Sequence, residues 1–154
     1  AYAAREHGDA RRAIDLLRIS GEIAERSGSS KVGIIHLDEA ESKIESDKII
    51  NATVGQPKQF QCVVYSILLL SPQRKNFFTG EIYELYKSLC KKTKFNVLTQ
   101  RRISDILAEL DMLGKINAKI ISKGRYGRTR EVSLSIDHSL QLKLKEILEK
   151  SLQL

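Results

Sequence analysis

The sequence has few of the residues that build metal centres and cross-linked scaffolds. Its 154 residues include only two cysteines and three histidines. Twenty-seven residues lie between Cys62 and Cys90, without a CxxC motif, and His7, His36 and His138 stand singly. Because zinc and redox sites need closely spaced ligands, this spacing argues against both. We expect two reduced, partly buried thiols in an intracellular protein.

Proline and long apolar runs are also scarce. The chain has two prolines, while hydrophobic residues make up 42% and charged residues 29%, which is typical of a folded, helix-rich protein. The longest apolar run, residues 63–70, contains Tyr65 and Ser66. It is too short to span a bilayer, and no signal-peptide pattern is present, so no membrane association is expected. The chain begins at Ala1 in the pattern of a helix already under way, which predicts a piece of a longer protein.

Common catalytic motifs are absent from the sequence. It contains no G-x-x-x-x-G-K-[ST], no GxSxG, no HExxH and no DxD-type metal pair. We therefore expect no catalytic residue, no metal ligand and no cofactor site of its own in this chain.

Positive charge is concentrated in one part of the chain. Residues 1–55 hold eight Lys/Arg and ten Asp/Glu, whereas residues 56–154 hold 18 Lys/Arg and nine Asp/Glu. The formal charges are therefore −2 and +9. A basic, well-folded module favours a polyanionic partner, with nucleic acid ahead of an acidic protein or a membrane surface.

The first part is predicted to be helical. Residues 1–7 look like the end of a helix that Gly8 stops, and Asp9 caps the next helix, which the run 27–30 ends. Its apolar face is predicted to hold Ala13, Ile14, Leu17, Ile23 and Ala24. A third helix is expected to begin at the acidic pair 38–39 and to end near residues 51–55. Gly55-Gln56-Pro57 then predicts a boundary between an all-α segment, 1–55, and a second domain, 56–154.

Three more helices are expected after that boundary. The first is an amphipathic helix from Lys58 to the break at Ser71-Pro72. The second begins at Thr79 and ends in a basic tail, and the third begins after Thr99 as N-cap and stops at Gly114. The apolar stripe of the third helix is predicted to be Ile103, Ile106, Leu107, Leu110 and Leu113.

The pattern then changes from helical spacing to alternation. Apolar residues alternate with polar ones in 116–120 and again in 132–136, which predicts a β-hairpin with a basic, glycine-containing tip. A final helix is expected over about 139–152. Helix, helix, helix and hairpin, in this order, predict a winged helix-turn-helix in a mainly α protein.

The third helix carries candidate DNA-reading residues on its exposed first turns. Arginine can contact guanine edges or phosphate, glutamine can read adenine, and threonine and serine can bind phosphate oxygens. A solvated helix face would show similar residues, so the hairpin is needed to decide between the two. The candidates are Thr99, Gln100, Arg101, Arg102 and Ser104.

The hairpin is rich in cations and contains no acid between residues 119 and 130. Lys119 is one of its five cations, and the glycines at 124 and 127 allow the loop to approach a surface closely. Mutual repulsion at such a tip is relieved by an anion. With Lys91, Lys92 and Lys94, about six to eight phosphate contacts are expected. The candidate contacts in the hairpin are Lys123, Arg125, Tyr126, Arg128 and Arg130.

The stretch Gly8-Asp9-Ala10-Arg11 resembles the opening of the second-sensor helix of AAA+ clamp loaders and replication initiators, where Gly-Asp-x-Arg begins a lid helix. Together with the winged module that follows, nearly the whole chain resembles the archaeal origin-recognition and cell-division-cycle type initiators. The resemblance implies the C-terminal part of a AAA+ lid in residues 1–55 and a winged-helix domain in residues 56–154.

The resemblance also implies function. Arg11 would sense the terminal phosphate of a nucleotide held elsewhere, so ATP or ADP with Mg is expected only in the full-length protein, which would bind and hydrolyse ATP. The winged module would bind double-stranded DNA at replication origins, with the third helix in the major groove and the hairpin on the adjacent groove or backbone. A helicase or other initiator subunits are further expected partners, and the expected location is the cytoplasm, at the nucleoid.

Two other functions stay open on the sequence alone. One is a winged-helix transcriptional regulator, which predicts a dimer interface, for example through the final helix. The other is a protein-docking module that recruits a replicative helicase through the apolar side of residues 139–152 or of the lid.

Overall fold

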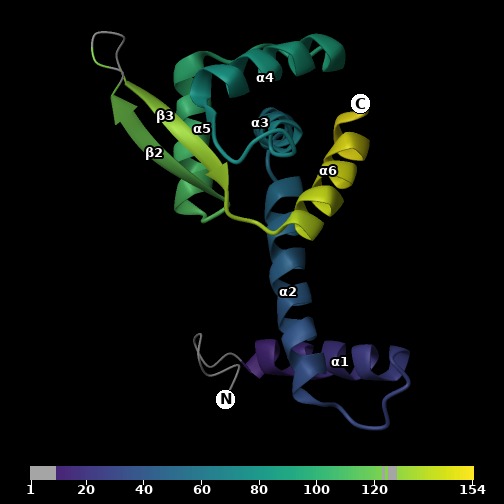
Figure 1. Ribbon diagram of the computed structural model, residues 1–154. Coiled ribbons are helices and arrows are strands. Elements are labelled where there is room, and N and C mark those ends of the chain that lie inside the picture. The colour runs from purple at the N-terminus through teal and green to yellow at the C-terminus, as the bar shows by residue number, and fades with distance from the viewer. Residues whose placement is uncertain (1–9, 123, 125–127) are drawn as a thin grey trace. The chain divides into compact units, whose positions relative to one another are not determined.

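The computed structural model describes residues 10–122, 124 and 128–154. Within these ranges the chain forms six helices and one three-stranded antiparallel sheet (Figure 1), which confirms the mainly α class with a winged helix-turn-helix. The predicted helix end at 1–7, its stop at Gly8 and the cap at Asp9 lie outside the described residues. No described helix is both long and apolar enough to cross a membrane. The contacts divide the chain into two compact units, 1–51 and 52–154.

The first unit, which we call the helical unit, contains α1 (Ala10–Arg26) and most of α2 (Ile34–Val54). Leu16 and Ile19 of α1 pack with Ala40 of α2 in a small apolar cluster, which Ile23, Leu37 and Ile44 flank. The guanidinium of Arg12 lies 3.6 Å from the carboxylate of Glu41. The two helices are therefore joined by one narrow apolar seam with an ion pair at its edge.

The predicted apolar face of α1 is partly wrong. Ile14 is 64% and Leu17 is 66% exposed, whereas Leu16 and Ile19 are buried. The two residues of each pair are three positions apart, so periodicity alone does not decide which pair is buried. The packing against α2 selects the stripe that begins at Leu16.

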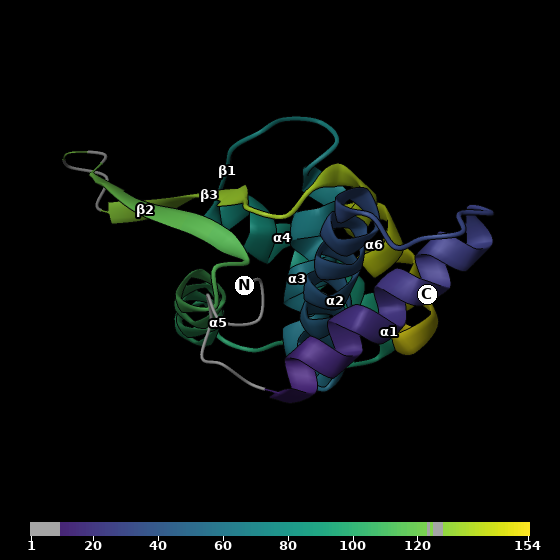
Figure 2. The same cartoon turned by 90° about the horizontal axis from the view of Figure 1, so that it is seen from below.

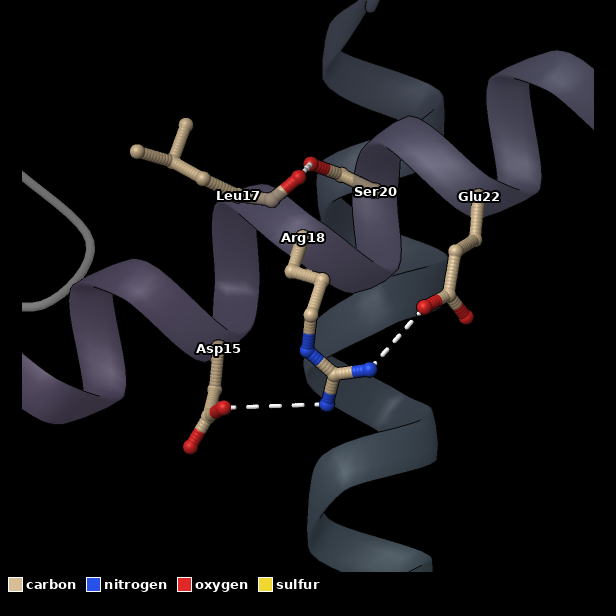
Figure 3. A network of polar contacts seen from close by, with 5 residues as sticks. All are labelled: Asp15, Leu17, Arg18, Ser20 and Glu22. Carbon is tan, nitrogen blue, oxygen red and sulfur yellow. Dashed lines mark hydrogen bonds and ion pairs between the residues drawn. The ribbon is translucent and has the colours of Figure 1, made fainter.

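The polar surface of α1 is held by ion pairs within the helix. Arg18 lies between Asp15, at 3.7 Å, and Glu22, at 2.9 Å, while Leu17 points away from the helix (Figure 3). Ser20 donates its hydroxyl proton to the carbonyl of Leu17, at 2.9 Å. Such exposed i,i+3 and i,i+4 pairs each stabilise a helix by only about 0.2–0.5 kcal/mol.

Helix α2 begins at Ile34, four residues before the predicted acidic start at Asp38. The ring Nδ1 of His36 accepts a hydrogen bond from the backbone N–H of Gly33, at 3.0 Å, and the ring Nε2 lies 3.3 Å from the Ser27 hydroxyl. The side chain of His36 therefore satisfies a backbone donor at the helix start. Ile34 and Ile35 are exposed. The apolar residues of this first turn therefore do not continue a buried stripe, and apolar periodicity could not locate the start of the helix.

The second unit, which we call the winged-helix unit, is built around α3 (Lys58–Leu70). Residues 60–68 of this helix are all buried, so α3 is the central helix of the unit and not the one-sided amphipathic helix that was predicted. Its two buried polar residues are satisfied: Gln61 donates to the carbonyls of Val54 and Gln56, and Ser66 donates to that of Cys62. Cys62 and Cys90 are both free and buried, as predicted for reduced thiols.

Three helices surround α3: α4 (Thr79–Thr93), α5 (Gln100–Met112) and α6 (His138–Leu152). Thr99 is the N-cap of α5, as predicted, since its hydroxyl oxygen accepts a hydrogen bond from the N–H of Arg102. Of the predicted stripe of α5, four residues are buried, but Leu113 is 49% exposed because α5 ends at Met112. Asp137 caps α6, and the apolar side of α6 is buried through Leu140, Leu144, Leu148 and Leu152.

The sheet consists of the predicted hairpin and one strand that the sequence did not suggest. β2 (Ile116–Ser122) and β3 (Arg128–Leu134) pair from 116↔134 to 122↔128, and the two-residue β1 (Phe77–Phe78) adds to the other edge of β3. Figures 1 and 2 show β2 and β3 projecting from the helices of this unit as a wing. Ile116 and Val132 are buried at its base, whereas Ile120 is 65% exposed.

Candidate nucleic-acid interface

A cleft lies between the first turns of α5 and the wing. It has a volume of about 430 Å³. We call it the helix–wing cleft. It brings together side chains from α5, both strands of the hairpin and the start of α4. Its lining residues are Thr79, Gln100, Arg101, Ser104, Ile120, Arg128, Thr129 and Arg130.

The cleft is positively charged. Three of its eight lining residues are arginines and none is acidic. None of the ion pairs between described residues involves Arg101 or Arg128. Guanidinium groups without a carboxylate partner make a concave surface that attracts anions, and their planar forks can bind phosphate or a guanine edge through two hydrogen bonds.

Arg130 has a structural contact as well as a place in the cleft. Its Nη1 donates a hydrogen bond of 2.6 Å to the carbonyl of Ser104, and its own carbonyl accepts from the hydroxyl of Thr79, at 3.4 Å. These bonds tie β3 to the middle of α5 and to the start of α4. The wing is therefore held beside α5 at its base, and Arg130 offers only its remaining guanidinium donors to a ligand.

The structure brings together some of the residues predicted for DNA binding. Gln100, Arg101 and Ser104 lie on one flank of α5 and face the hairpin, together with Arg128 and Arg130. The Ser104 hydroxyl donates to the carbonyl of Gln100, at 3.1 Å, so it offers a ligand an acceptor oxygen.

Other predicted residues lie elsewhere. Thr99 is occupied as the N-cap of α5, and Arg102 is exposed but does not line the cleft. Lys119 lies on β2, directly across from Glu131, and does not line the cleft. Lys123, Arg125 and Tyr126 lie outside the described residues.

Sequence reasoning missed three residues of the cleft: Thr79, Ile120 and Thr129. Thr79 reaches the cleft because β1 pairs Phe78 with Glu131, which places the next residue beside Arg130. A two-residue strand leaves no alternating pattern, so the sequence held no signal for this contact. Ile120 belongs to the predicted alternation of residues 116–120, but its side chain is exposed on the hairpin and borders the cleft.

The basic tail of α4 is exposed and separate from the cleft. Lys91 and Lys92 occupy the last turn of α4, and Lys94 follows as its C-cap with a left-handed φ of 58°. Cations at a helix C-terminus interact favourably with the helix dipole. The two lysines in the last turn therefore have a local structural role whether or not they contact a ligand.

The chain matches two known family models. Residues 51–143 match the C-terminal winged-helix domain of CDC6, and residues 1–42 match the AAA+ ATPase-type lid domain of Cdc6. These matches cover the lid and the winged helix of an AAA+ ATPase and not its ATPase core.

Archaeal relatives are similar over most of the chain. It is 52% identical over 139 residues to ORC1-type DNA replication protein 1 of Methanosarcina mazei and 53% identical over 137 residues to the ORC1-type DNA replication protein of Pyrococcus horikoshii. Each alignment covers 88% of this chain but 34% and 33% of the relative. The chain therefore spans about a third of the length of these relatives.

One solved structure is similar in both sequence and fold. The Aeropyrum pernix ORC1 protein, solved in complex with DNA, aligns with a TM-score of 0.76 and 44% identity, over 97% of this chain and 38% of that protein. With the match to the CDC6 winged-helix model over more than half of the residues, these similarities show that the chain belongs to the Cdc6/Orc1 family of DNA replication initiators and comprises its lid and winged-helix domains.

Proposed function

We propose that the chain binds double-stranded DNA at replication origins through the helix–wing cleft. In this proposal residues 1–55 form the C-terminal part of the lid and residues 56–154 form the winged-helix DNA-binding domain. The first turns of α5 enter the major groove, and the wing lies along the adjacent groove or the phosphate backbone, which is a known geometry of helix-turn-helix domains. The single observation that carries the proposal is the convergence of Arg101, Arg128 and Arg130 on one acid-free cleft.

The residues of the cleft divide into two kinds of contact. Gln100 and Arg101 lie in the first turn of α5, where side chains reach base edges, and a two-pronged contact from either would discriminate between bases by about 1–3 kcal/mol. Ser104, Thr129 and Arg128 are suited to phosphate oxygens, which fix position and supply affinity without reading sequence. From the sequence we add Thr99, Arg102, Lys123, Arg125 and Tyr126 to the proposed DNA-binding residues. The similar Aeropyrum pernix ORC1 protein was solved in complex with DNA, which supports DNA binding as the function.

The described contacts of α6 weigh against the use of this helix in both open alternatives. Leu140, Leu144, Leu148 and Leu152 are buried inside the winged-helix unit, so this stripe is not available for a dimer or for a helicase. A regulator that dimerises through this face of α6 and a module that docks through it are therefore less well supported than DNA binding.

Nucleotide chemistry requires more than these residues supply. Arg11 lies exposed in the first turn of α1, and a single guanidinium from one helix cannot hold a nucleotide and its Mg ion. We therefore expect no catalytic step on the residues of this chain alone. In the longer protein, we propose, Arg11 senses the terminal phosphate of bound ATP, ATP is hydrolysed elsewhere, and a helicase or other initiator subunits are recruited.

A salt-titrated binding experiment tests the proposal. The chain is titrated onto an origin-derived duplex and onto a scrambled duplex of the same composition, at several salt concentrations. About six to eight phosphate contacts predict a slope of log Kd against log salt of about 5 to 7, and base reading predicts tighter binding to the origin duplex. Equal binding to both duplexes would leave only a general polyanion-binding function, and no binding at low salt would contradict the proposal.

A further inference from the structure

The turn between α4 and α5 is fixed by side chains of α3 and α4. α4 ends at Thr93 with Lys94 as its C-cap, and the N–H of Phe95 donates to the carbonyl of Cys90, at 3.0 Å. The next residues, 96–98, are followed at once by Thr99, the N-cap of α5. This turn therefore decides where the first turn of α5 lies.

Three side chains bind the backbone of the turn. Gln59 of α3 donates its amide proton to the carbonyl of Asn96, at 2.6 Å. The hydroxyl of Tyr86 accepts from the N–H of Leu98, at 3.1 Å, and Tyr83 donates to the carbonyl of Leu98, at 3.2 Å. Gln59 and Tyr86 are also bound to each other, since the Tyr86 hydroxyl donates to Oε1 of Gln59, at 2.5 Å. We call Gln59, Tyr83 and Tyr86 the turn clamp.

Tyr86 is the centre of the turn clamp. Its side chain is fully buried, at 0% exposure, and its hydroxyl acts as a donor to α3 and an acceptor from the turn at the same time. Burial raises the pKa of Tyr86 well above its usual value, so the hydroxyl keeps the proton that it donates. Removing this oxygen would take the acceptor from the N–H of Leu98 and would leave Oε1 of Gln59 with the weaker contact from the Cys90 thiol, at 3.9 Å.

We propose that the turn clamp is a positioning device for DNA reading: Gln59 and Tyr86 set the orientation in which α5 presents Gln100 and Arg101 to base edges. This inference rests on the proposed function. Neither residue is expected to touch DNA, because both act through the backbone at 96–98. Their effect reaches the cleft because Gln100 follows Leu98 by only two residues.

Contacts with base edges and contacts with phosphates differ in how much displacement they tolerate. Hydrogen bonds to base edges weaken steeply when donor and acceptor are displaced or misaligned, whereas attraction between a guanidinium and the phosphate backbone falls off slowly with distance. A small shift of the first turn of α5 should therefore weaken discrimination between sequences more than it weakens overall affinity. A residue that only stabilises the fold would not show this difference.

The test compares two tyrosines that each lose one buried hydroxyl. Tyr86→Phe removes the oxygen at the centre of the turn clamp. Tyr65→Phe is the matched control, because Tyr65 is 5% exposed and its hydroxyl donates to Glu149 of α6, at 2.7 Å, away from the turn. The probes are a duplex that the wild-type chain enriches from a random pool and a scrambled duplex of the same composition.

Tyr86→Phe should lower the ratio of the two affinities by about threefold to tenfold, the range expected for one displaced hydrogen bond. Binding to the scrambled duplex should change by less than about twofold. Tyr65→Phe should leave the ratio unchanged, although both variants should lower the melting temperature. In the free chain, amide exchange at Leu98 should accelerate in Tyr86→Phe and not in Tyr65→Phe. Amide exchange therefore tests the hold of Tyr86 on the turn independently of DNA binding.

A second pair of variants tests the coupling between helices. Gln59→Met keeps the length of the side chain but removes its hydrogen bonds to Asn96, Tyr86 and the Cys90 thiol. It should therefore lower the affinity ratio as Tyr86→Phe does, and the double variant should lose little more than either single one. Additive losses would overturn the idea of one device. If the wild-type chain shows no preference, the proposed function itself fails; if it shows a preference that Tyr86→Phe retains, only the positioning role is overturned.

Discussion

The helical unit and the winged-helix unit differ in how much of their own apolar surface they bury. In the first, the core consists of Leu16, Ile19 and Ala40 with a few half-buried neighbours. In the second, α3 is buried all round, and α4, α5, α6 and the sheet each contribute fully buried residues. The helical unit also exposes large apolar side chains, namely Ile14, Leu17, Val32, Ile34 and Ile35.

This difference shows which unit has a self-sufficient core. The winged-helix unit also exposes some large apolar side chains, such as Met112 and Ile120, but only this unit has a helix that is buried along most of its length. The charges differ in the same sense, since residues 1–55 carry −2 and residues 56–154 carry +9. The second unit therefore combines the complete core with the candidate DNA surface.

The largest expected effect is a contrast in stability between two leucines. Leu148→Ala removes a fully buried side chain of α6 and should lower the free energy of unfolding by about 2–5 kcal/mol, whereas Leu17→Ala changes a side chain that is 66% exposed and should stay within about 0.5 kcal/mol. Urea titration of the whole chain, followed by circular dichroism, measures both. Equal losses would mean that Leu17 is buried in solution and would remove the contrast between the units.

The next effect concerns charge. Arg125→Ala with Arg128→Ala removes two cations of the wing and should weaken binding to any duplex while lowering the magnitude of the salt slope by about 2. The matched control, Arg18→Ala with Lys31→Ala, removes the same charge from the helical unit, where Arg18 is already paired with Asp15 and Glu22. Filter binding at several salt concentrations gives both slopes. If the wing variant left the slope unchanged, the proposed contacts of the wing with phosphates would be wrong.

A smaller effect concerns the stability that the N-cap of α6 gives to the winged-helix unit. Asp137 caps this helix by accepting from the N–H of Leu140 and the hydroxyl of Ser139, and Asp137→Ala should cost about 1 kcal/mol at neutral pH. The hydrogen bond from Ser139, followed by that from Leu140, lowers the pKa of Asp137 below its usual 3.8. The stabilisation is therefore present above pH 3.8 and is lost as the pH falls through the lower folded value.

Asparagine separates the cap from the charge. Asp137→Asn should keep most of the stability at neutral pH, because asparagine is also a good N-cap, but it should lose the part of the acid sensitivity that belongs to this carboxyl group. Thermal melts between pH 2 and 7 compare the two variants with the wild type. An Asp137→Ala variant as stable as the wild type at pH 7 would show that the cap contributes nothing.

Local patterns in the sequence were enough to predict most of the winged-helix unit. Thr99 as a cap, the stripe from Ile103 to Leu110 and the alternation around Val132 each reflect a rule that acts within a few residues, and the structure confirms all three. The contents of the cleft were harder to predict because they depend on pairing between distant segments. Thr79 reaches Arg130 across 51 positions, through a strand of two residues.

The helical unit was predicted less well because its local patterns are ambiguous. α1 offers two apolar stripes of equal spacing, through Ile14 and Leu17 or through Leu16 and Ile19, and only the contact with α2 decides between them. The start of α2 depends on the ring of His36 binding the backbone of Gly33, which no propensity scale anticipates. The turn clamp went unnoticed for a related reason: Gln59 and Tyr86 are 27 residues apart and look like ordinary helix residues.

The smallest expected effect tests most sharply whether the helical unit takes no part in DNA binding. Arg11 lies exposed at the start of α1, in the part of the chain that carries a net negative charge. If this arginine serves nucleotide sensing in the longer protein and not DNA contact, Arg11→Ala should leave the affinity of this chain for duplex DNA within about twofold and its salt slope unchanged, because no phosphate contact is lost. Arg101→Ala is the positive control, since it should alter sequence preference in the same binding assay. A large loss with Arg11→Ala would mean that the helical unit contacts DNA directly, and the comparison between a DNA-binding unit and a separate lid would no longer hold.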